Sequence, residues 1–228
     1  MPPEANAEFV CAMADTLAVY QRPYDVQRPL VCCDEGTKPW VQDVRTPLAA
    51  EAGRPERIND EYERHGPGNL FMMFEPLAGR REVLVTERRT AVDDAEAIQH
   101  RLDVSYPRAE KIVLRQDNLH THQLASLSEA CPPEEARRWI DKLEIHDTPQ
   151  HGSWLNMAEI EVGVWRGQCL DRRIPDFPTL TSAVTAWQSA RNAAQVKVDW
   201  QFTTADARVK LTRLYPILEP VKNKWTNH

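Results

Sequence analysis

The chain has 228 residues, of which 42% are hydrophobic and 27% are charged, and its formal net charge is −6. A chain of this length can bury a sizeable core without a disulfide or a structural metal, and its five cysteines contain no CxxC pair. No apolar run approaches the roughly 20 residues of a membrane span, and the negative charge excludes a uniformly basic nucleic-acid coat.

The first half of the chain predicts a helix followed by a group of strands. Leu30 to Cys33 form a short, apolar, β-prone run that is closed by Asp34 and Glu35, which is typical of a buried strand. The following segment is rich in Pro, Gly and charge and predicts a loop. The expected elements are a helix at 9–20, strands at 30–33, 70–74 and 82–86, a loop over 45–69 and a turn at 76–79.

The second half predicts strands that alternate with helices. Pro132 and Pro133 suit the first turn of a helix, and Ser153 is expected to cap a long helix with an apolar stripe. This order predicts an α/β fold with a mixed five-stranded sheet flanked by helices. The expected elements are helices at 91–102, 134–143, 153–170, 180–193 and 204–215, and strands at 111–114 and 143–146.

Three acidic residues fall where one site can form. Asp34 ends the first strand, Asp117 follows the strand at 111–114, and Glu159 lies beside the apolar stripe of the long helix, which should turn it toward the sheet. Clustered carboxylates repel one another unless a cation compensates them, and Mg²⁺ or Mn²⁺ suits such oxygen ligands. Two such ions, about 3.5–4 Å apart, support phosphoryl transfer.

The segments around these acids resemble the three acidic blocks of DDE transposases, and more narrowly the bacterial insertion-sequence branch related to the mariner elements. The Asp-Asn-x-x-x-His block that starts at Asp117 and the Ser-Trp-Leu-Asn-x-x-Glu block that ends at Glu159 carry the resemblance. It covers most of residues 10–216. The similar segments are 31–35, 69–76, 86–90, 114–122, 149–159, 169–175 and 200–208.

The resemblance implies a ribonuclease H-like fold and metal-dependent DNA cleavage and strand transfer at the ends of an insertion sequence. Asp34, Asp117 and Glu159 are the implied catalytic and metal-binding triad, with two Mg²⁺ or Mn²⁺ ions as cofactors. The implied partner is double-stranded DNA, both transposon ends and target, bound by a homodimer or by this chain paired with a separate DNA-binding half. The expected location is the bacterial cytoplasm, with association to the nucleoid on DNA and no membrane partner.

Further residues near these blocks are candidates for touching substrate or orienting the acids. Asn118 either orients a carboxylate or forms a turn. His120 and His122 could together bind zinc, but His122 is expected instead to contact a DNA phosphate or to support the acids. Trp154 either stacks on a base or packs the loop, and packing is favoured. The candidates are Asn118, His122, Trp154, Asn156, Arg172 and Arg173.

Two neighbouring acids are expected to lie outside the site. Glu35 should point to the opposite face of its strand from Asp34. Glu161 lies roughly 200° around the helix from Glu159 and is expected to be solvated.

The domain boundaries expected are an extension over 1–28, a catalytic domain over 29–216 and a tail over 217–228. Two departures from the family pattern keep alternatives open: 41 residues separate Asp117 from Glu159, and no room precedes Leu30 for the usual helix-turn-helix modules. The alternatives are an inactive remnant that pairs with or inhibits a full-length transposase, and another ribonuclease H-like nuclease.

The charge is divided unevenly along the chain. Residues 160–228 contain 10 Lys and Arg against 6 Asp and Glu, whereas residues 1–159 contain 18 against 28. Because a phosphate backbone attracts positive charge, DNA is expected on the side formed by residues 160–228.

Overall fold

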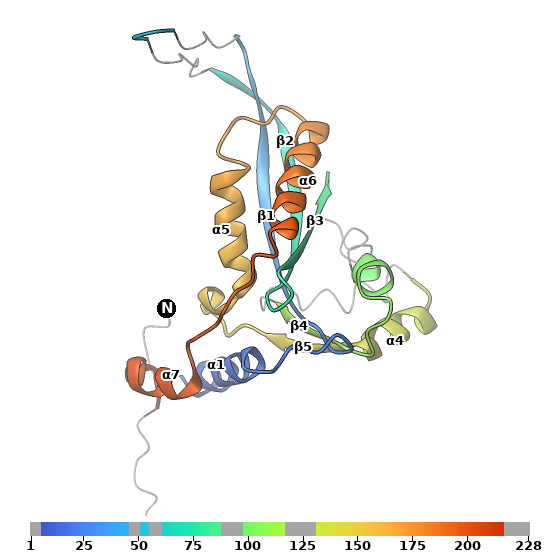
Figure 1. The fold of residues 1–228 in the computed structure, drawn as a ribbon, viewed down its shortest axis with the longest axis vertical. Helices are drawn as coiled ribbons and strands as arrows, with labels where there is room; N and C mark the ends of the chain where they lie inside the picture. Colours follow the sequence, from blue (N-terminus) through green and yellow to red (C-terminus); the bar gives the residue numbers. More distant parts are fainter. Residues whose placement is uncertain (1–5, 46–50, 55–60, 88–97, 117–130, 217–228) are drawn as a thin grey trace, which may run out of the picture.

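The computed structural model describes residues 6–45, 51–54, 61–87, 98–116 and 131–216, and its centre is a five-stranded sheet (Figure 1). The strand order is β3-β2-β1-β4-β5. The first three strands pair antiparallel, and the last two run parallel to β1, so the predicted mixed sheet is confirmed. The strands are β1 (Leu30–Asp43), β2 (Tyr62–Glu75), β3 (Arg80–Thr86), β4 (Ile112–Gln116) and β5 (Leu143–Asp147).

Two groups of helices cover the two faces of the sheet (Figure 1). On one face, α5 and α6 pack on the even-numbered residues of β1 and β2, such as Cys32 and Met72. On the other face, α4 and a helical segment at 98–105 pack on Val31 and Cys33. The alternation follows from the two-residue period of a strand. The helices are α4 (Pro133–Lys142), α5 (Met157–Gln168) and α6 (Phe177–Ala193).

A third cluster joins the start of the described chain to its end. In it, α1 (Ala7–Tyr20) buries Met13 and Leu17 against Leu155, which precedes α5, and against α7 (Thr204–Lys210). Figure 1 shows α1 and α7 lying together across one end of the sheet. None of the helices within the described ranges is long and apolar enough to cross a membrane.

Side chains of α6 cover the outer edge of β3. The amide oxygen of Gln188 accepts from the backbone N–H of Val83 at 2.7 Å. Asn192 bonds both backbone groups of Arg81, accepting from its N–H and donating to its C=O at 2.8 Å each. A helix of the same chain therefore satisfies the backbone N–H of Val83 and both backbone groups of Arg81 on this edge strand.

The structure confirms most of the predicted elements and corrects several boundaries. Residues 62–69 were expected in a loop but belong to β2, where they pair with the second half of β1. The helix expected from 180 begins at Phe177, because Pro178 suits a first turn. The helix expected through 215 ends at Lys210 and is followed by a 3₁₀ turn, η4 (Thr212–Leu214).

The helix expected at 91–102 is only partly within the described ranges. Residues 91–97 lie outside them, and the chain continues as a π-helical turn, η1 (His100–Ser105). Ile98 and Leu102 are buried in the core on the α4 side of the sheet, as the helical spacing of these apolar residues predicts.

Candidate active site

Asn156 fixes the start of α5 onto β1. Its side-chain oxygen accepts from the backbone N–H of Ala158 at 3.1 Å and so caps the helix. Its side-chain N–H₂ donates to the backbone oxygen of Cys33 at 2.8 Å. Asn156 is 1% exposed, so both bonds are shielded from water. The first turn of α5 is therefore held beside the residue that precedes Asp34.

Ser153 is not the helix cap that the sequence predicted. It begins a 3₁₀ turn, η3 (Ser153–Leu155), that ends directly before Asn156. The η3 turn delays the start of α5 by one turn, and the cap passes to the next residue with a suitable side chain.

Asp34 is half-buried on the face of β1 that α5 covers. Cys32 packs in the same core cluster as Ala158 and Trp165, and a Cβ on Gly36 would lie 3.1 Å from the Trp165 ring. Asp34 stands between these two positions, so it shares their face. Its carboxylate accepts from the backbone N–H of Glu35 at 2.8 Å, which fixes one oxygen.

Glu159 and Glu161 lie the opposite way from what the sequence predicted. Glu159, in the first turn of α5, is exposed instead of turned toward the sheet. Glu161 is 2% exposed instead of solvated. The reason is helical spacing: Glu161 is three residues after Ala158 and four before Trp165, both of which face the sheet.

Glu161 is neutralised by two arginines from other elements. Arg81 of β3 approaches it through Nε at 2.9 Å, and Arg191 of α6 through a terminal nitrogen at 2.7 Å. Burial lowers the pKa of Arg81, and Glu161 opposes that shift. The three residues tie α5 to β3 and α6, which is a structural role.

The two parallel strands β1 and β4 direct their carboxyl ends the same way. Cys32 pairs with Arg115, and β4 ends at Gln116, whose backbone oxygen accepts from Thr148 at 2.8 Å. Asp117 is the next residue of the chain. Four residues predicted near this point lie outside the described residues: Asp117, Asn118, His120 and His122.

Two members of the predicted triad, Asp34 and Glu159, lie within the described residues. Within the described ranges, no group of three or more His, Cys, Asp or Glu side chains is arranged to hold a metal ion. Asp34 and Glu159 are described, and both supply carboxylate oxygens, the ligand type that Mg²⁺ and Mn²⁺ prefer. The donor chemistry of these two residues fits a hard divalent cation.

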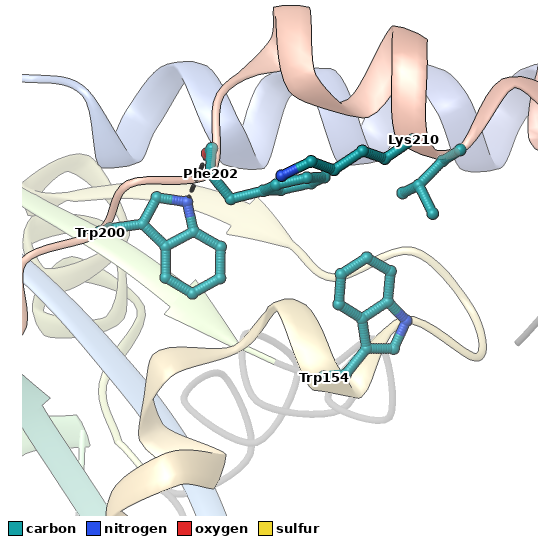
Figure 2. A pocket seen from close by; sticks show the side chains of 5 residues that line it. Trp154, Trp200, Phe202 and Lys210 are labelled. Carbon is teal, nitrogen blue, oxygen red and sulfur yellow. Dashed lines mark hydrogen bonds between the residues drawn. The ribbon is translucent and has the colours of Figure 1, made fainter.

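An open cavity of about 430 Å³ lies beside the start of α5. Figure 2 shows Trp154 facing Phe202 and Lys210 across this cavity, with Trp200 beside them. Trp154 is 38% exposed, and the ammonium of Lys210 lies 5.6 Å from the Phe202 ring centroid. The sequence favoured packing for Trp154, but its side chain borders an open space. The lining residues are Trp154, Trp200, Phe202, Lys210 and Leu211.

The two arginines after α5 are placed differently from each other. Arg172 is exposed. Arg173 pairs with Asp43 at the far end of β1 and lies 5.5 Å from the Tyr62 ring. At ~3.3 Å per residue, Asp43 is ~30 Å along the strand from Asp34, so Arg173 does not join the acids there.

One residue of the site was not predicted from the sequence. The hydroxyl of Tyr20 contacts the backbone on both sides of Asn156, at Leu155 and at Met157. Tyr20 and Leu155 are 135 residues apart in the chain, and no local sequence pattern predicts a contact at that separation.

Comparisons with known proteins give a family and a fold. Residues 29–181 match the family model described as DDE superfamily endonuclease. The Mos1 mariner paired-end complex with Mn has a TM-score of 0.53 at 16% identity, over 86% of this chain and 60% of that one. The Mos1 strand transfer complex has a TM-score of 0.55 at 14% identity, over 83% of this chain and 57% of that one.

These likenesses show the fold, which is the ribonuclease H-like mixed sheet flanked by helices. A third structure, the Mos1 transposase paired-end complex with left transposon end, gives a TM-score of 0.54 at 17% identity, over 94% of this chain and 65% of that one. The chain thus spans about 60% of the length of the solved structures it matches. A comparison with curated protein sequences finds no match.

Proposed function

Because the chain belongs to the DDE superfamily of endonucleases, we propose that it is the catalytic domain of a transposase. In this proposal it cleaves DNA at the ends of a mobile element and joins the freed 3′ end to target DNA. The observation that carries the proposal is the anchoring of α5 on β1, which holds the first turn of α5 next to Asp34 on one face of the sheet.

We assign the catalytic triad to Asp34, Asp117 and Glu159. Asp34 and the first turn of α5 share one face of the sheet. Support for Asp117 comes from the strand register. Cys32 of β1 pairs with Arg115 of β4. Asp34 comes two residues after Cys32, and Asp117 comes two residues after Arg115. Glu159 is exposed in the first turn of α5, where the helix dipole favours negative charge.

We propose that these acids bind two Mg²⁺ or Mn²⁺ ions. The Mos1 paired-end complexes with Mn and with Mg are the solved structures that motivate these metals. When bound, the ions would lower the pKa of the attacking water or hydroxyl and neutralise charge on the phosphate. The protein's own part is positioning: the bond from Glu35 N–H orients Asp34, and the Asn156 bonds fix the turn that carries Glu159.

We propose that double-stranded DNA crosses the end of the sheet where α5 begins. Trp154 and Lys210 line an open cavity there. Arg172, which is exposed beyond the other end of α5, would have to be reached by DNA that extends along the helix. Cations hold the phosphates of a duplex, and an exposed aromatic face can stack on a base that is unpaired at a DNA end. The element is proposed to be a bacterial insertion sequence, and the chain is proposed to act as a homodimer or beside a separate DNA-binding half.

For the domain limits, we propose a catalytic domain over residues 29–216, with an extension at 1–28 and a tail at 217–228. The extension would help to hold the catalytic domain together, because α1 packs on Leu155 and on α7.

Nicking of a supercoiled plasmid in Mg²⁺ or Mn²⁺ tests the triad directly. Asp34→Asn, Asp117→Asn and Glu159→Gln should each lower the rate by more than the ~100-fold that follows loss of an outer partner of a metal ligand. Glu134→Gln is the matched control, because Glu134 is also an exposed acid in the first turn of a helix but lies on α4, across the sheet. Nicking that persists in Glu159→Gln, or in EDTA, would contradict the assignment.

A strand-transfer assay separates transposition from other cleavage. A transposase joins a labelled DNA end to the plasmid, whereas another ribonuclease H-like nuclease would cut branched DNA without joining. A remnant that only partners a full-length transposase would do neither.

A further inference from the structure

Tyr20, the last residue of α1, contacts the start of α5 through its hydroxyl. The hydroxyl donates to the backbone oxygen of Leu155 at 2.6 Å and accepts from the backbone N–H of Met157 at 3.3 Å. These two groups flank Asn156, the cap of α5. Tyr20 is 5% exposed, so the contacts form away from water.

The position of this hydroxyl is fixed by its surroundings. The rings of Tyr20 and Trp200 pack edge to face, with centroids 4.9 Å apart and planes at 62°. The thiol of Cys32 lies 4.0 Å from the hydroxyl. Burial raises the pKa of Tyr20 well above its usual value, so the hydroxyl keeps its proton and can donate.

The contact supplies what the first turn of a helix lacks. Met157 is the first residue of α5, and the first N–H groups of a helix have no partner within the helix. A phenylalanine at position 20 would keep the ring contacts but leave the Met157 N–H and the Leu155 C=O unpaired in a buried place. Packing alone therefore does not account for a tyrosine here.

Two independent contacts thus hold the same turn. Asn156 ties it to β1 through Cys33, and Tyr20 ties it to α1. Glu159 is the third residue of α5 and is exposed, so the direction of its carboxylate depends on the backbone of this turn.

We propose that Tyr20 is a positioning residue for Glu159: its hydroxyl fixes the first turn of α5 at the angle at which Glu159 can meet a divalent metal together with Asp34. The inference rests on the proposed function. In this inference α1 contributes to catalysis by positioning Glu159, although α1 precedes the predicted catalytic domain at residues 29–216.

Tyr20→Phe tests the proposal, with Tyr106→Phe as the matched control. Tyr106 is also a tyrosine with a hydroxyl bond, to Glu75 at 3.0 Å, but it packs on the α4 side of the sheet. The rate of amide hydrogen exchange at Met157–Glu159, relative to the amides of β4, measures how firmly this turn is held. It needs no catalytic assay. Exchange there should become at least ~10-fold faster in Tyr20→Phe and should not change in Tyr106→Phe.

Metal binding gives the second measurement. The Mn²⁺ affinity of the full chain, followed by electron paramagnetic resonance, should fall by about 10–100-fold in Tyr20→Phe, the range for loss of an outer partner of a metal ligand. In nicking assays, kcat at limiting Mn²⁺ should fall while the KM for plasmid stays unchanged.

The outcomes separate this inference from the proposed function. Unchanged exchange at the first turn of α5 in Tyr20→Phe overturns the inference, as does faster exchange with unchanged Mn²⁺ affinity. If the wild-type chain nicks no DNA, the proposed function fails, and exchange and Mn²⁺ affinity still decide whether Tyr20 positions the turn.

Discussion

Glu159 and Glu161 stand two residues apart on α5, and the structure gives them opposite environments. Glu159 is exposed, whereas Glu161 is enclosed between Arg81 and Arg191. The same helix therefore carries a candidate metal ligand on one side and a buried anchor on the other. Substituting each acid by its amide separates the two roles.

Glu161→Gln should destabilise the fold strongly. It removes the negative charge that compensates two arginines, one of them fully buried, and losing one partner of a buried pair costs about 3–5 kcal/mol. Glu159→Gln should change the free energy of unfolding by less than about 0.5 kcal/mol while abolishing nicking. Urea unfolding of both variants checks this, and similar stability losses would refute the division of roles.

Asn156→Ala should cost about 1–3 kcal/mol, because it removes the cap of α5 and leaves the Cys33 carbonyl without this buried donor. Ser153→Ala is the control: Ser153 is exposed and does not cap α5, so its loss should fall within about 0.5 kcal/mol. Thermal unfolding compares the two. An equal loss in Ser153→Ala would mean that the helix begins earlier in solution.

Glu144, on β5, gives the fold a dependence on acid pH. It hydrogen-bonds to Arg22 at 2.6 Å and to His146 at 3.1 Å, and it also pairs with Arg28. Burial raises the pKa of its carboxyl, but these bonds outweigh burial and lower the pKa to about 2. Since the unfolded value is about 4.3, Glu144 stabilises the fold above that pH, and the contribution is lost as the pH falls toward 2.

Glu144→Gln should therefore be less stable than the wild type at pH 7, and the difference should shrink as the pH falls from about 4.3 to 2. Urea midpoints at several pH values measure this. Glu134→Gln, an exposed substitution on α4, should show no such trend. A constant difference for Glu144→Gln across this range would contradict the depressed pKa.

Trp154→Ala should weaken DNA binding with little effect on stability. Stacking of an unpaired base, such as one at a DNA end, on an aromatic side chain contributes about 1–3 kcal/mol, and Trp154 is 38% exposed beside an open cavity. The salt dependence of binding should not change, because no charge is lost. Lys210→Ala should instead reduce the salt slope by about 1. Unchanged affinity in Trp154→Ala would show that this side chain only packs its loop.

The sequence predicted the elements that local periodicity defines. Alternating and continuous apolar runs located the cores of β1, β3 and β4, and proline placement located α4. Residues 62–69 were missed because Gly66, Pro67 and Gly68 resemble a loop, yet they pair with the second half of β1. Pro67 faces Pro39 there, beside a register shift that tolerates both prolines.

At the candidate site, the sequence named Asp34, Glu159 and Asn156, but it indicated neither the burial of Glu161 nor the contact of Tyr20 with the start of α5. The burial of Glu161 is decided by arginines that lie 80 and 30 residues away in the chain, and the role of Tyr20 by a backbone group 135 residues away. Such contacts depend on the tertiary arrangement. One local signal did exist, since Glu161 lies at helical spacing from Ala158 and Trp165.

The contacts between α6 and the edge of β3 affect whether two copies of the chain can pair their sheets. An open edge of a sheet is a template for a strand of another molecule and hence for aggregation. Gln188 bonds the backbone N–H of Val83, and Asn192 bonds the N–H and C=O of Arg81, three of the groups that such a strand would need. A strand of a second copy could therefore pair with β3 at Arg81 and Val83 only after Gln188 and Asn192 of α6 had released these groups.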